Sequence, residues 1–168
     1  MPAVVMPAYT HPLTADDWRI AHLVDAIWHD HFADISRANQ IVAGYDYPWK
    51  WRLGRIRMTL DGRASEIVLN GLLDSGEVPD VIRIAILSHE IVHYIQGFAS
   101  PLPRRHQHAH AHGCVSHELA RRGLGDHERA LDEWAVAVWP AFQEQARWRH
   151  SARHIVWPSC ATVAKMVY

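Results

Sequence analysis

The residues with the clearest chemical potential are His89, Glu90 and His93, which form an HExxH sequence. On a helix, positions i and i+4 share one face, so both imidazoles can bind one Zn²⁺. Glu90 then lies beside a water on that ion. Its carboxylate can take the water's proton as the oxygen attacks a carbonyl, and can pass a proton to the leaving amine. The pattern therefore predicts a zinc-dependent hydrolase with Glu90 as general base and general acid.

The sequence around HExxH determines how specifically the motif indicates a zinc site. The chain is rich in histidine, with 14 in 168 residues, and at this composition HExxH arises by chance in about one such chain in twenty. However, residues 79–97 predict a single helix that is apolar on nearly all sides and ends at Gly97. Burying a glutamate and two histidines there without a metal is costly. This context favours zinc binding over histidines that merely pack in a core.

A catalytic zinc needs a third protein ligand. The metzincin continuation HxxGxxH is absent, because Gln96 and Ala99 stand at its positions. One candidate is Glu128, which begins an ExxxD pattern on a predicted later helix, as in gluzincins. The other candidates are histidines of the 98–112 loop, namely His106, His108, His110 and His112. Of these, His112 alone is followed by a glycine and a predicted helix.

The elements around the motif predict an α+β fold. Helices are expected from about residue 14 to Phe32, over 79–97, over 114–122 and from 126 towards 139, and residues 35–48 are expected to form a loop or short helix. Strands over 51–60 and 66–70 flank an Asp61–Gly62 turn and predict a hairpin. We expect a short sheet packed on the central HExxH helix, within a single domain spanning 1–168. Residues 1–13 would be an extended tail and 126–168 a helical extension.

Residues 49–125 resemble the SprT-like (Spartan-type) zinc metalloprotease domain. The likeness rests on five ordered segments: Leu53–Gly54–Arg55, the strand 66–70, Leu72–Leu73, HExxH, and His112–Gly113 before a helix ending at Leu124–Gly125. It implies a zincin-type fold, endopeptidase activity and Zn²⁺ held by His89, His93 and His112. The family often has an aromatic residue just after the HG pair, where Cys114, Val115 and Ser116 stand here. We expect no C-terminal zinc ribbon. His112 is favoured over Glu128, and both stay open.

Composition restricts the partners. Net charge is −1, and 49% of residues are apolar, so the chain is not a polycation for nucleic acid or membranes. We expect no membrane span or signal peptide, and a cytoplasmic location in which Cys114 and Cys160 stay reduced. The segment 49–52, Trp-Lys-Trp-Arg, combines aromatic and basic residues as single-strand nucleic-acid sites do, and SprT-like relatives act on DNA-associated proteins.

The expected partner is a protein or peptide substrate. We expect that substrate to pair with a sheet edge formed by strand 66–70 or its partner strand. Two other functions are compatible with the sequence: a binding module with a purely structural, closed zinc site, and a pH-responsive interaction protein that uses its histidines.

Overall fold

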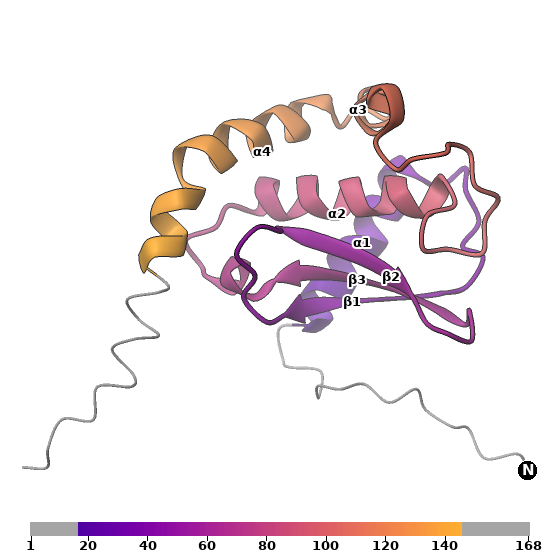
Figure 1. Ribbon diagram of the computed structural model, residues 1–168, viewed down its shortest axis with the longest axis horizontal. Coiled ribbons are helices and arrows are strands. Elements are labelled where there is room, and N and C mark those ends of the chain that lie inside the picture. Colours follow the sequence, from indigo (N-terminus) through magenta and orange to yellow (C-terminus); the bar gives the residue numbers. More distant parts are fainter. Residues whose placement is uncertain (1–16, 146–168) are drawn as a thin grey trace, which may run out of the picture. The chain divides into compact units, whose positions relative to one another are not determined.

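A computed structural model describes residues 17–145, so the expected tail 1–13 lies outside the described part. The contacts between residues divide the chain into two compact units, Met1–Glu133 and Trp134–Tyr168. The expectation of a single domain over 1–168 stays a prediction. The first unit contains, in order, α1 (Asp17–His31), β1 (Gln40–Asp46), β2 (Gly54–Met58), β3 (Ala64–Asn70), η1 (Gly71–Asp74), α2 (Asp80–Ile95), η2 (Ala111–Gly113) and α3 (Cys114–Arg121) (Figure 1). Helix α4 (Gly125–Ala137) begins in the first unit and ends in the second. The α+β class is confirmed.

The three strands form a mixed sheet in the order β1-β3-β2. The expected hairpin is confirmed, because β2 and β3 pair antiparallel, and Gly62 adopts a φ of +70° at their turn. The segment 66–70 lies in the central strand, so it is not an edge; the two edges of the sheet are its partner strands β1 and β2, and β2 is the edge that packs on α2. Residues 35–48 were expected to form a loop or short helix, and this prediction is wrong for 40–46, which form β1 parallel to β3.

The central helix α2 is buried as its sequence predicts. It packs against β2 and β3, while α1 packs against β1 and also touches α2. Ile67 and Leu69 of β3 and Ile91 of α2 are completely buried. The Trp28 ring of α1 meets the Tyr94 ring of α2 edge-on, with centroids 5.5 Å apart. These contacts fix α2, and with it the HExxH residues, against the sheet.

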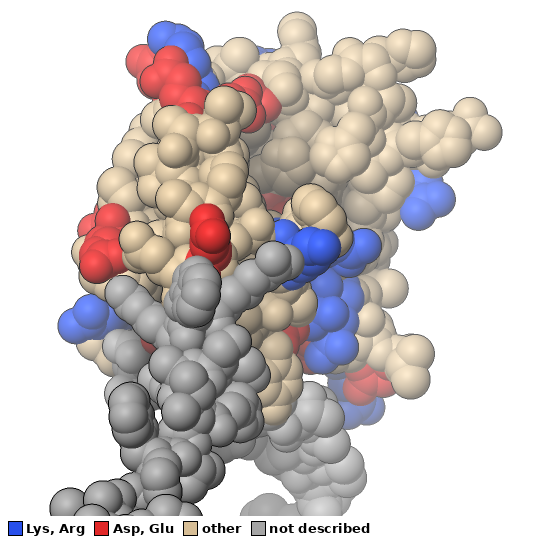
Figure 2. All heavy atoms as spheres, turned by 60° about the vertical axis from the view of Figure 1, so that its left-hand side comes forward, with Lys and Arg blue, Asp and Glu red and all other residues tan. Residues whose placement is uncertain are grey.

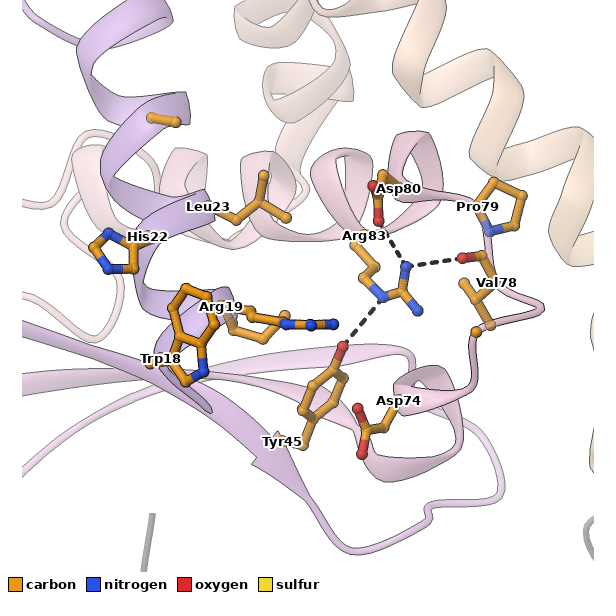
Figure 3. Close-up of a pocket in the computed structure, with 13 residues that line it drawn as sticks. Trp18, Arg19, His22, Leu23, Tyr45, Asp74, Val78, Pro79, Asp80 and Arg83 are labelled. Carbon is orange, nitrogen blue, oxygen red and sulfur yellow. Dashed lines mark hydrogen bonds and ion pairs between the residues drawn. The ribbon is translucent and has the colours of Figure 1, made fainter. Parts of the chain in front are cut away.

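Each end of α2 is held by specific interactions. At its start, Arg83 donates hydrogen bonds to the Tyr45 hydroxyl and to the Leu73, Ser75 and Val78 carbonyl oxygens. Figure 3 shows this arginine in a cleft of about 890 Å³ that it shares with α1 residues. At its end, Gly97 has a φ of +80°, and Phe98 N–H donates to the His93 carbonyl at 2.9 Å. This is a Schellman-type stop, and it confirms the predicted end of the helix.

The described part of the second unit is a small aromatic cluster. The Trp134, Trp139 and Phe142 rings lie with centroids 5.8–6.3 Å apart. None of the helices within residues 17–145 is both long and apolar enough to cross a membrane.

Candidate metal centre

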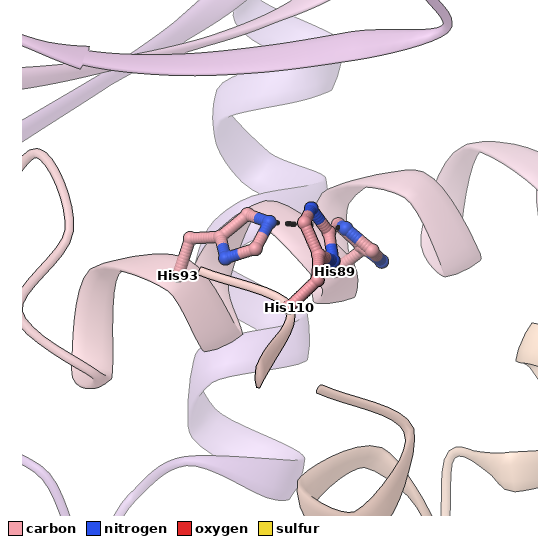
Figure 4. Close-up of side chains that lie close together, drawn as sticks. All are labelled: His89, His93 and His110. Atoms are coloured by element: carbon pink, nitrogen blue, oxygen red, sulfur yellow. Dashed lines mark hydrogen bonds between the residues drawn. The ribbon is translucent and has the colours of Figure 1, made fainter. Parts of the chain in front are cut away.

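Three histidine side chains converge above α2. His89 and His93, one turn apart, place their Nε2 atoms 3.1 Å from each other. His110 reaches them from the loop after α2, with its ring centroid 5.2 Å from His89 and 4.7 Å from His93 (Figure 4). One ligand nitrogen from each ring lies within 4.8 Å of the other two. The helical spacing therefore does bring the two motif histidines to one point, as predicted.

The geometry of this cluster fits a zinc ion. Two imidazole nitrogens bound to one tetrahedral Zn²⁺ at about 2.0–2.1 Å lie roughly 3.3–3.4 Å apart, close to the observed separation of His89 and His93. Burial, together with the charge of neighbouring histidines, lowers the pKa of His89 to about 4 and that of His93 to about 3. Both rings are therefore neutral at pH 7, which is the form that binds metal.

The structure differs from the sequence-based prediction at the third ligand. His112 is exposed and does not belong to the cluster. It lies in the η2 turn with a φ of 52°, two residues past His110. Glu128 does not belong to the cluster either, and its carboxylate accepts a hydrogen bond from the Ser116 hydroxyl at 2.6 Å. Among the described residues, His110 is the one that completes a three-ligand set.

One buried side chain, that of Gln96, connects the two ends of the loop that carries His110. Gln96, 3% exposed at the end of α2, donates from Nε2 to the Cys114 carbonyl at 3.3 Å and accepts from the Cys114 thiol at 3.5 Å. The same thiol lies 3.4 Å from the carbonyl of Ala109. Gln96 and Cys114 therefore hold the residue directly before His110 against the end of the helix.

Glu90 points towards the sheet rather than into the core. It is 7% exposed, and this burial raises the pKa of its carboxyl to about 7, although the Arg52 charge and a hydrogen bond from the Ile56 backbone oppose the shift. A Cβ placed on Gly54 would lie 3.1 Å from the Glu90 Oε1 atom and 2.5 Å from the Ile86 side chain. Strand β2 thus approaches α2 closely because residue 54 has no side chain.

The cluster and Glu90 line a cleft of about 640 Å³ between β2 and α2. Residues 51–56 form one wall, and His89, Glu90 and His93 form its floor. Phe98 and Ala99 lie beyond His93, and Ala109, His110 and Leu131 complete the lining. The histidine cluster and Glu90 therefore lie in a groove that β2 lines on one side.

Sequence reasoning did not single out His110 from the other loop histidines, and it did not assign a role to Gln96. Nothing in the sequence separates His110 from its neighbours, because histidine occupies every second position from 106 to 112. The choice depends on the loop's path, which Gln96 and Cys114 set through tertiary contacts.

Comparisons with protein-family models, curated proteins and solved structures found no match. The functional interpretation therefore depends on the chemistry of the site itself.

Proposed function

We propose that the protein is a zinc-dependent endopeptidase in which His89, His93 and His110 hold Zn²⁺ and Glu90 is the general base and acid. The observation that carries the proposal is the position of Glu90, which is buried and lies next to three convergent histidines. A bound zinc would supply Lewis acidity and an acidified water. With a pKa near 7, the Glu90 carboxyl can both accept and return a proton at neutral pH.

The surrounding structure supports this assignment over a purely structural zinc site. Closed structural sites use four protein ligands, whereas catalytic sites use three and keep a position for water. Within residues 17–145 the cluster holds three histidines, and it lies in a groove rather than in the core. The His93 Nδ1 atom is buried without a partner in that range, so the polar contacts of this ring lie on its Nε2 side, towards the cluster.

The groove also supports peptide hydrolysis. Besides the histidines and Glu90, its lining includes residues 51–53 and Phe98–Ala99, so a peptide can contact the groove beyond the reacting groups, which suits cleavage within a chain. The edge strand β2 presents backbone groups to an extended substrate. We infer on this basis, together with the SprT-like resemblance, a zincin-type fold and a cytoplasmic enzyme, with DNA-associated proteins as one substrate class.

The direct test is Glu90→Gln in zinc-loaded protein, assayed on an unstructured protein substrate such as casein. We expect activity to fall by about 10²–10⁴, the usual contribution of a general acid–base, while bound zinc, measured by mass spectrometry, stays at one equivalent. Glu66→Gln serves as the control, because Glu66 pairs with Arg57 away from the groove. Undiminished activity in Glu90→Gln would reject the mechanism.

A further inference from the structure

Arg52 differs from the other basic residues of β2 and the segment before it. The Arg55 guanidinium pairs with Asp46 and that of Arg57 pairs with Glu66, so the charge of each is neutralised within the sheet. Arg52 is exposed and lines the groove. Among residues 17–145 no carboxylate forms an ion pair with it. The wall of the groove thus contains an arginine whose charge is available to a ligand.

The backbone that carries Arg52 is fixed by a buried side chain. Asn70, with no exposed surface, donates from Nδ2 to the carbonyl oxygens of Trp49 and Arg52 at 2.8 and 2.7 Å. Its backbone N–H donates to the Leu53 carbonyl at 2.8 Å. Breaking these hydrogen bonds would leave a buried amide without partners, which costs free energy. The backbone of segment 49–53 is therefore fixed in position as part of the groove wall.

Arg52 lies within electrostatic reach of the reacting groups, since its charge acts on Glu90. It precedes Gly54, the residue over the Glu90 carboxylate, by two positions. Two residues span at most about 7 Å of chain, so the Arg52 backbone lies within about that distance of the Gly54 backbone. An extended peptide in the groove covers that distance with two or three residues. On the face that Figure 2 shows, several Lys and Arg side chains lie close together near the centre of the view, and others are scattered towards its edges.

We propose that Arg52 recognises a carboxylate of the substrate, two or three residues from the peptide bond that is cleaved. The inference rests on the proposed peptidase function and narrows it to acidic peptides. A guanidinium binds a carboxylate through two parallel hydrogen bonds. Aspartate or glutamate side chains and a peptide's C-terminal carboxylate share this chemistry.

The test measures binding, so that it does not depend on turnover. Fluorescein-labelled decapeptides, neutral and amidated, carry a single Glu or its isostere Gln at each position in turn. Zinc-loaded Glu90→Gln protein is titrated against them and followed by anisotropy. We expect the best Glu peptide to bind about three- to tenfold more tightly than its Gln partner, as for a partly exposed ion pair. Arg52→Gln should remove this difference and Arg52→Lys should restore part of it.

Arg57→Gln is the matched control, because it removes an arginine of the adjoining strand β2 that is not part of the groove lining, and it should keep the preference. If affinity rises only when the C-terminal amide is replaced by a free carboxylate, the group that Arg52 recognises is the C-terminal carboxylate. Equal affinities, a preference that survives Arg52→Gln, or tighter Arg52-dependent binding to oligo(dT) than to any acidic peptide would overturn the inference. Cleavage of these peptides without a charge preference rejects this inference alone, whereas Arg52-dependent binding without cleavage by wild type rejects the peptidase proposal alone.

Discussion

At the scale of single residues, the sequence and the structure differ over which side chain joins His89 and His93 as the proposed third ligand. The structure brings His110 to His89 and His93, whereas His112 is exposed and Glu128 is bonded to Ser116. We expect His110→Ala to weaken zinc binding roughly 100-fold or more, because two ligands hold the ion poorly. His112→Ala and Glu128→Ala should bind zinc like wild type. Competition titration with a chromogenic chelator measures all three affinities.

The opposite ranking, with His112→Ala or Glu128→Ala losing zinc and His110→Ala keeping it, would contradict the cluster seen in the structure. Substituting His108, which lies in the same loop outside the cluster, controls for a general effect of removing a histidine.

What the sequence predicts about the site follows from how local each constraint is. The pairing of His89 with His93 depends only on helix geometry, and the apolar residues around them predict that helix strongly. The place of Glu90 next to the cluster follows from the same helix. His110 is fixed instead by side chains distant in sequence, namely Gln96 at the helix end and Cys114 in the next helix. A loop in which histidines alternate gives no local signal for that choice.

At the scale of secondary-structure elements, the close approach of β2 to α2 brings Glu90 under the edge strand. Gly54 permits this approach, since a Cβ there would lie 2.5 Å from the Ile86 side chain. We expect Gly54→Ala to displace either the strand or Glu90 and to lower kcat/KM at least tenfold, with zinc content unchanged. The measurement is the casein assay together with thermal unfolding. Displacements of about 1 Å at a reacting group have effects of this size.

Gly76→Ala is the matched control for this substitution. A Cβ at position 76 meets no atom within 4 Å, so activity and stability should both stay near wild type. Full activity in Gly54→Ala would show that the contact between β2 and α2 does not position the reacting groups.

How well the sequence predicts each helix or strand also depends on how local its stabilising interactions are. The hairpin of β2 and β3 has alternating residues and a local turn at Asp61–Gly62, and α2 has apolar residues throughout. Strand β1 contains Ala43 and Gly44, which favour strands weakly. Its pairing with β3 is parallel, so its partner is reached only through the intervening β2. That strand becomes evident only once the sheet has formed.

At the scale of the first unit as a whole, one arginine joins the end of α3 to the end of α1. The Arg122 side chain is 4% exposed and bonds Glu118, Asp34 and the His31 carbonyl, while its guanidinium lies 4.5 Å from the centre of the Phe32 ring. Because α3 follows the loop that carries His110, this contact anchors the helix in which that loop ends. We expect Arg122→Met to lower the free energy of unfolding by roughly 1–3 kcal/mol, measured by urea denaturation.

The neighbouring Arg121 supplies the control, and pH supplies a second test of the same contact. Arg121 is 54% exposed and pairs with Glu118 alone, so Arg121→Met should change stability by less than about 0.5 kcal/mol. The two arginines lower the pKa of Glu118 below its ordinary 4.5, and Arg122 lowers that of Asp34 below its ordinary 3.8. A depressed carboxyl pKa stabilises the fold above the unfolded-state pKa and loses that effect as pH falls through the folded value. The stability difference between wild type and Arg122→Met should therefore be constant near neutral pH and narrow below pH 4.5; a difference that persists at pH 2 would assign it to packing on Phe32 and not to the ion pairs.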